Sequence, residues 1–331
     1  MFSFLFNRVP IGTTFRRDST AQLGFLLQNP SSLKYISSKA LRNQNPFVVS
    51  YLIRSCGFSP AAAISASKKV DFESSDKPDS VLALFRNHGF TEAQISSIIR
   101  KCPLLLVTSP TKNLLPKLEF FLSMGVPSPD IAKILSKDPN FMRSSLENKI
   151  IPAFNFFKSS VGTVEKFVIC LSWATRFIRF DIQKMARNIA ILRENGVPES
   201  NIVSILTYRP GTVTPKNDRF KQIVEEIKQM GFDLSKSFFV TTLHVLTSVK
   251  KSTWEQKLEA YRKWGFSENE ILMVFRRYPW IMIISEKKIM SHMDFFVNKM
   301  GWERAVLISY PQLLGHSLEK RILPRCSVYK Y

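Results

Sequence analysis

Apolar residues recur along the chain at helical spacing, in runs of about ten residues that end at a glycine or a proline. In one such run, Leu114, Leu118 and Phe121 fall on a single face of a helix. Gly125 follows this run, and glycine is the residue that most readily adopts the left-handed conformation just beyond a helix end. The pattern therefore predicts one amphipathic helix that stops at Gly125.

A second run follows directly and predicts a second helix. Its apolar face contains Ile131 and Ile134, and Ser128 or Asp130 is expected to cap its first turn. Pro139 disfavours helix for the preceding residue and removes an amide donor, so this helix must stop or turn there. A short third segment over 141–146 is expected before the next helix opens near residue 150.

The same arrangement recurs along the chain, as two markers show. Successive glycines that precede the second helix are separated by 32 to 37 residues, and four prolines each lie 14 residues after one of them. The glycines are Gly57, Gly89, Gly125, Gly162, Gly196, Gly231, Gly265 and Gly301; the prolines are Pro103, Pro139, Pro210 and Pro279. Two markers that share one period define a repeating unit of two helices and a short helical turn.

Such a unit is too small to bury its apolar faces alone, so neighbouring units must stack. We predict an all-α, curved solenoid of about seven to eight units, with a degenerate first repeat and linker over 41–78 and the main repeat domain over 79–331. The units at Gly162 and Gly231 lack the proline, and Pro311 follows Gly301 by only ten residues. The pattern therefore specifies the local geometry of the Gly162 and Gly231 units less closely than that of the others.

Composition excludes several classes of protein. The 331 residues are 45% hydrophobic and 22% charged, as in a folded protein, and charged residues interrupt the apolar stretches before they reach the length of a membrane span. The four cysteines and four histidines are scattered, which predicts no metal site and no disulfide framework. No motif of a nucleotide-binding loop, hydrolase or metalloprotease is present. We expect no enzymatic activity, no cofactor and no small-molecule substrate.

The net charge of +21 is divided unevenly. Residues 1–70 hold nine basic residues and one acid, which leaves +13 for the remainder. The first twenty residues are rich in Phe, Arg, Ser and Thr, the composition of an organelle import peptide, and we expect a transit peptide over about 1–40, mitochondrial rather than plastid. The alternative is a basic tail without a targeting role.

The repeat resembles that of the mTERF family of organellar transcription-termination-factor proteins, and most closely its plant members. The residues that carry the resemblance are DSVLALFRNHGFTEAQISSIIRKCPLLLV at 79–107, LLPKLEFFLSMGVPSPDIAKILSKDPNFMRSSLENKIIPAFNFFKS at 114–159 and WGFSENEILMVFRRYPWIMIISEKKIMSHMDFFVNKMGW at 264–302. Pentatricopeptide and tetratricopeptide repeats have a similar period but lack the recurrent proline. The resemblance implies a half-ring superhelix with a basic groove for double-stranded nucleic acid, and a role in organellar gene expression.

Basic residues accompany the helix breaks, and cations spaced by one repeat match the regular charge of a phosphate backbone. Those beside the breaks are Arg100, Lys101, Lys137, Arg143, Arg176, Arg179, Arg209, Lys250, Lys251, Arg276 and Arg277. Those near the start of the next helices are Lys149, Lys184, Lys216, Arg219, Lys287, Lys288, Lys320 and Arg321. The competing interpretation is that these cations only complement helix dipoles.

Three functions follow from this charge pattern. The first is a monomeric double-stranded DNA binder that regulates organellar transcription. The second is an organellar RNA binder that supports intron splicing or ribosomal RNA maturation. The third is a protein-interaction scaffold whose basic face meets acidic partners. Aromatic residues near the breaks, such as Trp173 and Tyr208, could stack on unpaired bases, although the period places most aromatics in the core.

Overall fold

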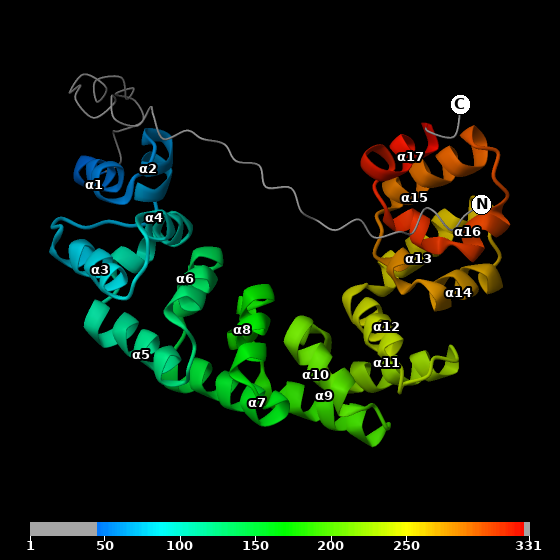
Figure 1. Cartoon of the computed structure of the whole chain (residues 1–331), viewed down its shortest axis with the longest axis horizontal. Helices are drawn as coiled ribbons and strands as arrows, with labels where there is room; N and C mark the ends of the chain where they lie inside the picture. The colour runs from blue at the N-terminus through cyan, green and yellow to red at the C-terminus, as the bar shows by residue number, and fades with distance from the viewer. Residues whose placement is uncertain (1–44, 328–331) are drawn as a thin grey trace.

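A computed structural model describes residues 45–327, and this part of the chain contains helices and no strand. Figure 1 shows the helices following one another along an open arc, with α4, α6, α8 and α10 on its inner side and α3, α5, α7 and α9 along its outer side. The predicted all-α, curved solenoid is confirmed. The predicted transit peptide lies outside the described residues.

Each unit consists of a first helix, a second helix and, in most units, a short third segment. The first helices are α1 (Pro46–Cys56), α3 (Asp76–Asn87), α5 (Leu115–Ser123), α7 (Ile151–Val161), α9 (Ile182–Glu194), α11 (Asn217–Gln229), α13 (Lys251–Arg262), α15 (Glu286–Met293) and α17 (Leu323–Ser327). The second helices are α2 (Pro60–Ser67), α4 (Glu92–Lys101), α6 (Ser128–Lys137), α8 (Val164–Trp173), α10 (Glu199–Tyr208), α12 (Ser237–Ser248), α14 (Glu268–Arg277) and α16 (Arg304–Ser309).

The third segments are η3 (Pro103–Val107), η5 (Pro139–Arg143), η7 (Thr175–Arg179), η8 (Pro210–Val213), η9 (Pro279–Met282) and η11 (Pro311–Gly315). Four further single turns are continuous with a first helix: η4 (Pro110–Leu114), η6 (Leu146–Ile150) and η12 (Leu318–Ile322) open α5, α7 and α17, and η10 (Asp294–Lys299) extends α15.

The glycine marker is confirmed in every unit, including the two that lack the proline. All eight glycines have positive φ, between 67° and 89°, in the turn between the first and second helix. A side chain would strain that backbone conformation, which explains why glycine recurs there.

The second helix starts and ends differently from the sequence prediction in two respects. Neither Ser128 nor Asp130 caps α6, because Pro127 is its N-cap residue and no side chain caps it. The third segment η5 begins at Pro139 itself rather than at Phe141, since a proline fits the first position of a helical turn, where the missing amide costs no hydrogen bond.

The two units without proline behave differently from each other. In the Gly162 unit, η7 forms at Thr175–Arg179 without any proline. In the Gly231 unit the third segment is absent: α12 continues to Ser248, and α13 begins at Lys251. The prediction of a third segment in every unit is therefore wrong here, and also in the Gly57 unit, where no helical segment lies between α2 and α3.

The core runs the length of the array between the two layers of helices. At its centre Phe154 and Phe157 of α7 contact Phe167 of α8, with ring centroids 5.0 and 5.4 Å apart. Phe177 of η7 packs edge-on against Phe157 at 5.7 Å. The third segment thus completes the apolar core of its own unit.

Buried polar side chains also hold the third segments in place. Lys117, Asn188 and Lys257 all lie eight residues before the turn glycine of their unit and are buried. The Asn188 amide donates to the backbone carbonyls of Val213 and Pro215, at 3.1 and 2.9 Å. These residues look like surface positions in the sequence, but they connect the first helix to the chain that follows the second helix.

Candidate nucleic-acid interface

Several predicted cations at the ends of second helices bind the next unit of the solenoid. The Lys101 ammonium lies 2.5 Å from the carbonyl oxygen of Ser136, at the end of α6. The Arg277 guanidinium donates to the carbonyl of Ile308 at 3.0 Å, at the end of α16. These side chains satisfy carbonyls that a helix end leaves free, so the dipole interpretation accounts for them in part.

Lys137 repeats this contact, because its ammonium donates to the carbonyl of Ser172 at the end of α8. Two further cations reach other carbonyls: Arg276 donates to Met230 at 2.6 Å, and Lys288 donates to Gly315 at 2.7 Å. Burial lowers the pKa of Lys288.

Two predicted arginines lie against aromatic rings. The Arg209 guanidinium is 4.6 Å from the ring centroid of Trp280, and burial lowers the pKa of Arg209. The Arg100 guanidinium is 5.4 Å from the ring of Phe58. Both geometries suit a cation–π interaction that stabilises the packing of neighbouring units.

Two others face carboxylates. The Arg219 guanidinium is 2.7 Å from Glu226, two turns further along the same side of α11. Arg179 is 3.9 Å from Asp138, a carboxylate that also accepts a hydrogen bond from Thr175. Their charge is therefore partly neutralised.

The ten remaining predicted cations make no side-chain hydrogen bond or ion pair with any residue over 45–327, and all of them except the half-buried Lys184 are exposed. They are Arg143, Lys149, Arg176, Lys184, Lys216, Lys250, Lys251, Lys287, Lys320 and Arg321. All ten lie in third segments or at the start of first helices, where one unit joins the next. We call this set of residues the junction edge, because the joins between units follow one another along the array.

The dipole interpretation fails for cations at the start of first helices, because a helix N-terminus carries partial positive charge. Lys216 and Lys250 occupy the N-cap positions of α11 and α13, and Lys287 lies in the first turn of α15. These cations increase the positive potential of the helix end. A bound anion would meet both the side-chain charge and the free backbone amides.

Acidic residues accompany most of these helix starts, and their number decides where positive charge accumulates. Glu147, Asp181, Asp218, Glu286 and Glu319 each lie at the start of one first helix. The start of α13 has none, while Lys250 and Lys251 are both exposed there. From α11 onward, each start has two cations against one acid or no acid, so the positive excess is greatest in the C-terminal half of the array.

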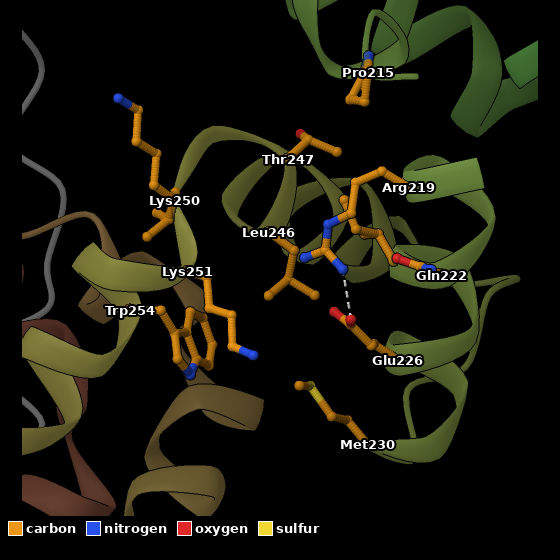
Figure 2. A pocket seen from close by; sticks show the side chains of 12 residues that line it. Pro215, Arg219, Gln222, Glu226, Met230, Leu246, Thr247, Lys250, Lys251 and Trp254 are labelled. Atoms are coloured by element: carbon orange, nitrogen blue, oxygen red, sulfur yellow. Dashed lines mark hydrogen bonds and ion pairs between the residues drawn. The ribbon is translucent and has the colours of Figure 1, made fainter. Parts of the chain in front are cut away.

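A hollow opens beside the start of α13, and three predicted cations, Arg219, Lys250 and Lys251, line it. It has a volume of about 730 Å³ and lies between α11, the end of α12 and α13, with Arg219 and Lys250 among its lining residues. Figure 2 shows Lys250 and Lys251 on one side of the hollow and the ion pair of Arg219 with Glu226 on the other. The apolar lining includes Met230, Leu246 and Trp254.

Two aromatic side chains at the ends of second helices are exposed. Trp173 ends α8 and is 69% exposed, and Tyr208 ends α10 and is 55% exposed. The Lys137 ammonium lies 5.5 Å from the ring of Trp173. Large aromatic rings with this exposure can stack on nucleobases.

One cation of the junction edge was missed from the sequence. Lys112 lies in η4 at the start of a first helix, is exposed, and has no acid in its first turn. It lies 23 residues after Gly89, the same offset at which Arg219 follows Gly196. The repeat period itself was the signal that could have identified it.

No helix within residues 45–327 combines the length and the apolar character that a membrane crossing requires.

The family model for mTERF matches residues 82–292 and 240–331. Over 143 residues, 43% of the chain, the sequence is 20% identical to transcription termination factor MTERF8, chloroplastic, of Arabidopsis thaliana. Over 133 residues, 35% of the chain, it is 24% identical to transcription termination factor MTERF15, mitochondrial, of the same plant. Each match spans 29% of the relative's own length.

Proposed function

The chain belongs to the mTERF family, and we propose that it is an organellar nucleic-acid-binding protein that regulates transcription by holding double-stranded DNA along its junction edge. The single observation that carries this proposal is the row of exposed, unpaired cations at the joins between units. The names of the two plant relatives, one chloroplastic and one mitochondrial, support an organellar role in transcription.

The physical basis is a match of two repeating charge patterns. A duplex presents phosphates at regular spacing, and each phosphate that meets a lysine or arginine releases condensed counterions. Arg143, Lys216 and Lys287 come from three different units, so together they can follow a backbone rather than bind one phosphate. The proposal requires binding and positioning only, and no chemical step.

RNA binding is the second candidate, and the exposure of Trp173 and Tyr208 favours it. A base-paired duplex hides the faces of its bases, whereas loops and single strands offer them for stacking. If RNA is the ligand, a structured fragment with unpaired loops should bind more tightly than a DNA duplex. Support of intron splicing or ribosomal RNA maturation would then be the cellular role.

The test compares the full chain with a variant in which Arg143, Arg176, Lys216 and Lys287 are alanine. The matched control replaces Lys133, Lys166, Lys221 and Lys236, which lie in or beside α6, α8, α11 and α12 and do not belong to the junction edge, and it removes the same charge. Binding of a fluorescent DNA duplex and of a structured RNA is measured by anisotropy over a range of salt concentrations. The first variant should lose up to about four phosphate contacts, and each lost contact should reduce the slope of log K against log salt concentration by about 0.9. The control should keep most of its slope.

Equal losses in both variants would show that binding depends on total charge, and the junction edge would lose its assignment. Absence of binding to either nucleic acid at low salt would favour a scaffold that binds acidic proteins. Tight RNA binding with weak duplex binding would replace the DNA proposal by the RNA one.

We place the protein in the mitochondrion, with the chloroplast as the alternative. The support is the basic, acid-poor composition of the first forty residues. Residues 1–44 fused to a fluorescent protein should carry it into mitochondria of plant cells. Accumulation in plastids would select the alternative, and diffuse fluorescence would contradict both.

A further inference from the structure

The Gly231 unit lacks the third segment that six other units have. Its second helix, α12, continues to Ser248, where those units turn into a third segment. The hollow of about 730 Å³ lies on the side of α11 that faces α13, as Figure 2 shows. This volume falls within the range of about 300–1,000 Å³ that binding pockets occupy.

Equivalent positions in the neighbouring unit show what the hollow lacks. In α9, Asn188 lies eight residues before its turn glycine and donates to two carbonyls in the chain that follows α10. In α11, Ile223 has the same offset from Gly231 and lines the hollow. Where one unit binds its own polypeptide through an amide, this unit has a buried apolar side chain in the wall of the hollow.

The third segments define the chemistry that fits such a face. In η5 the buried residues are Pro139, Phe141 and Met142, and η3, η9 and η11 bury the same first, third and fourth positions. Each is a short turn that opens with proline and buries two apolar side chains. The lining of the hollow, with Ile223, Leu246 and Trp254, is apolar in the same way.

The charge at the entrance adds a second requirement. Lys250 and Lys251 line the hollow, and neither has a side-chain partner within the described chain. The N-terminus of α13 beside them has no side-chain cap and no acid in its first turn. The lining glutamate, Glu226, is already bound to Arg219. An occupant with carboxylates beside its apolar turn would therefore neutralise both lysines.

We propose that this hollow binds a proline-containing apolar turn of a partner protein, flanked by acidic residues, which takes the place of the missing third segment. The partner would supply in trans the element that six other units supply from their own chain. This gives the solenoid a protein-docking site that shares Lys250 and Lys251 with the junction edge, and the argument for it does not rest on the nucleic-acid proposal.

The test uses the full chain and a fluorescein-labelled peptide, EEDPNFMEE, in which the turn sequence of residues 138–142 carries glutamates on both sides. Anisotropy should show saturable binding. A peptide with serine in place of the Phe and Met, and one with lysine flanks, should each bind at least ten-fold more weakly. The first control removes the apolar contacts and the second reverses the charge.

Two variants of the protein locate the binding site. Lys250→Glu with Lys251→Glu should weaken peptide binding at least ten-fold, whereas Lys221→Glu with Lys236→Glu, an equal charge change outside the hollow, should alter it less than two-fold. Met230→Trp places an indole in the hollow, where Figure 2 shows the Met230 side chain, and should abolish peptide binding. Circular dichroism and melting confirm that each variant is folded.

Non-saturable binding, or equal effects of the two charge variants, would overturn the proposal. Loss of oligonucleotide binding in Met230→Trp, with peptide binding retained, would show that the hollow belongs to the nucleic-acid interface and would also overturn it. Self-association of the chain that Met230→Trp abolishes would identify a second copy as the occupant instead.

Discussion

The ammonium of Lys117 donates a hydrogen bond of 2.6 Å to the backbone carbonyl of Met142, which lies 25 residues further along the chain. Lys117 belongs to the first helix of its unit and Met142 to the third segment, and both are buried. Burial lowers the pKa of Lys117. This lysine, which resembles a surface cation in the sequence, is a structural bond between the two ends of a unit.

Replacing Lys117 by alanine should therefore destabilise the fold. The change leaves the Met142 carbonyl unpaired and removes the packing of the lysine stem, at a cost of about 2–3 kcal/mol. Lys117→Met keeps the stem volume and removes a desolvated charge, so it should cost less. Urea unfolding measures both, and Lys112→Ala, at an exposed position of η4, should change stability by no more than about 0.5 kcal/mol. Equal stability of Lys117→Ala and wild type would contradict the role of this bond.

The turn glycines should tolerate substitution poorly even where space is available. Gly125 has φ of +84°, and no neighbouring atom lies within 4 Å of the place that an alanine methyl group would take, so Gly125→Ala tests backbone conformation alone. It should lower stability by about 1–2 kcal/mol, because an L-residue is strained there. Gly211 lacks a positive φ, and Gly211→Ala should have a smaller effect on melting. The same loss in both variants would rule out the conformational explanation.

Replacing a cation that has a structural partner and replacing a cation of the junction edge should have different effects on melting and on nucleic-acid binding. Arg277→Ala removes the hydrogen bond to Ile308 and should lower the melting temperature with little change in the salt slope of nucleic-acid binding. Lys287→Ala should reduce that slope by about 0.9 and leave melting unchanged, if it contacts one phosphate. The opposite pattern would exchange the two roles.

His244 should make the protein sensitive to mild acid. Burial, followed by the charge of Arg209, lowers its pKa to about 4 from an ordinary value of 6.5. The unfolded chain then binds a proton between pH 6.5 and pH 4 that the folded chain does not, so stability falls as the pH drops through this window. His244→Gln should flatten the dependence of the melting temperature on pH between these values. An unchanged dependence would show that His292 and His316, whose pKa values burial also lowers, account for it.

The cysteines should react in two classes. Cys56, Cys102 and Cys170 are buried, and burial raises the pKa of Cys56 and Cys170 to about 12. Cys326 is half-buried, near the end of the array. In the native protein one thiol, Cys326, should react first with a disulfide reagent, and the other three should react only as the protein unfolds. Rapid labelling of Cys170, identified by mass spectrometry, would contradict the packing at the centre of the core.

Sequence periodicity was sufficient to predict the repeating unit, because the residues that mark the unit act on the backbone beside them. A glycine in the left-handed conformation and a proline that opens a helical turn impose their geometry on the residues beside them, so the prediction was confirmed even at Gly162, where the proline is missing. It was wrong where a local marker was absent and nothing nearby replaced it: α12 of the Gly231 unit continues as a helix, and the hollow follows from that.

The roles of the individual cations could not be predicted in this way, because each role depends on atoms about one unit away in sequence. Lys101 and Lys250 are both exposed lysines at a helix boundary, yet one lies 2.5 Å from a carbonyl of the next second helix and the other has no partner over residues 45–327. Amino-acid order set the period, the helices and the excess of positive charge. Only the packing of one unit on the next determined which cations hold the solenoid together and which are free to bind, since that depends on where the carbonyl ends of neighbouring helices lie in space.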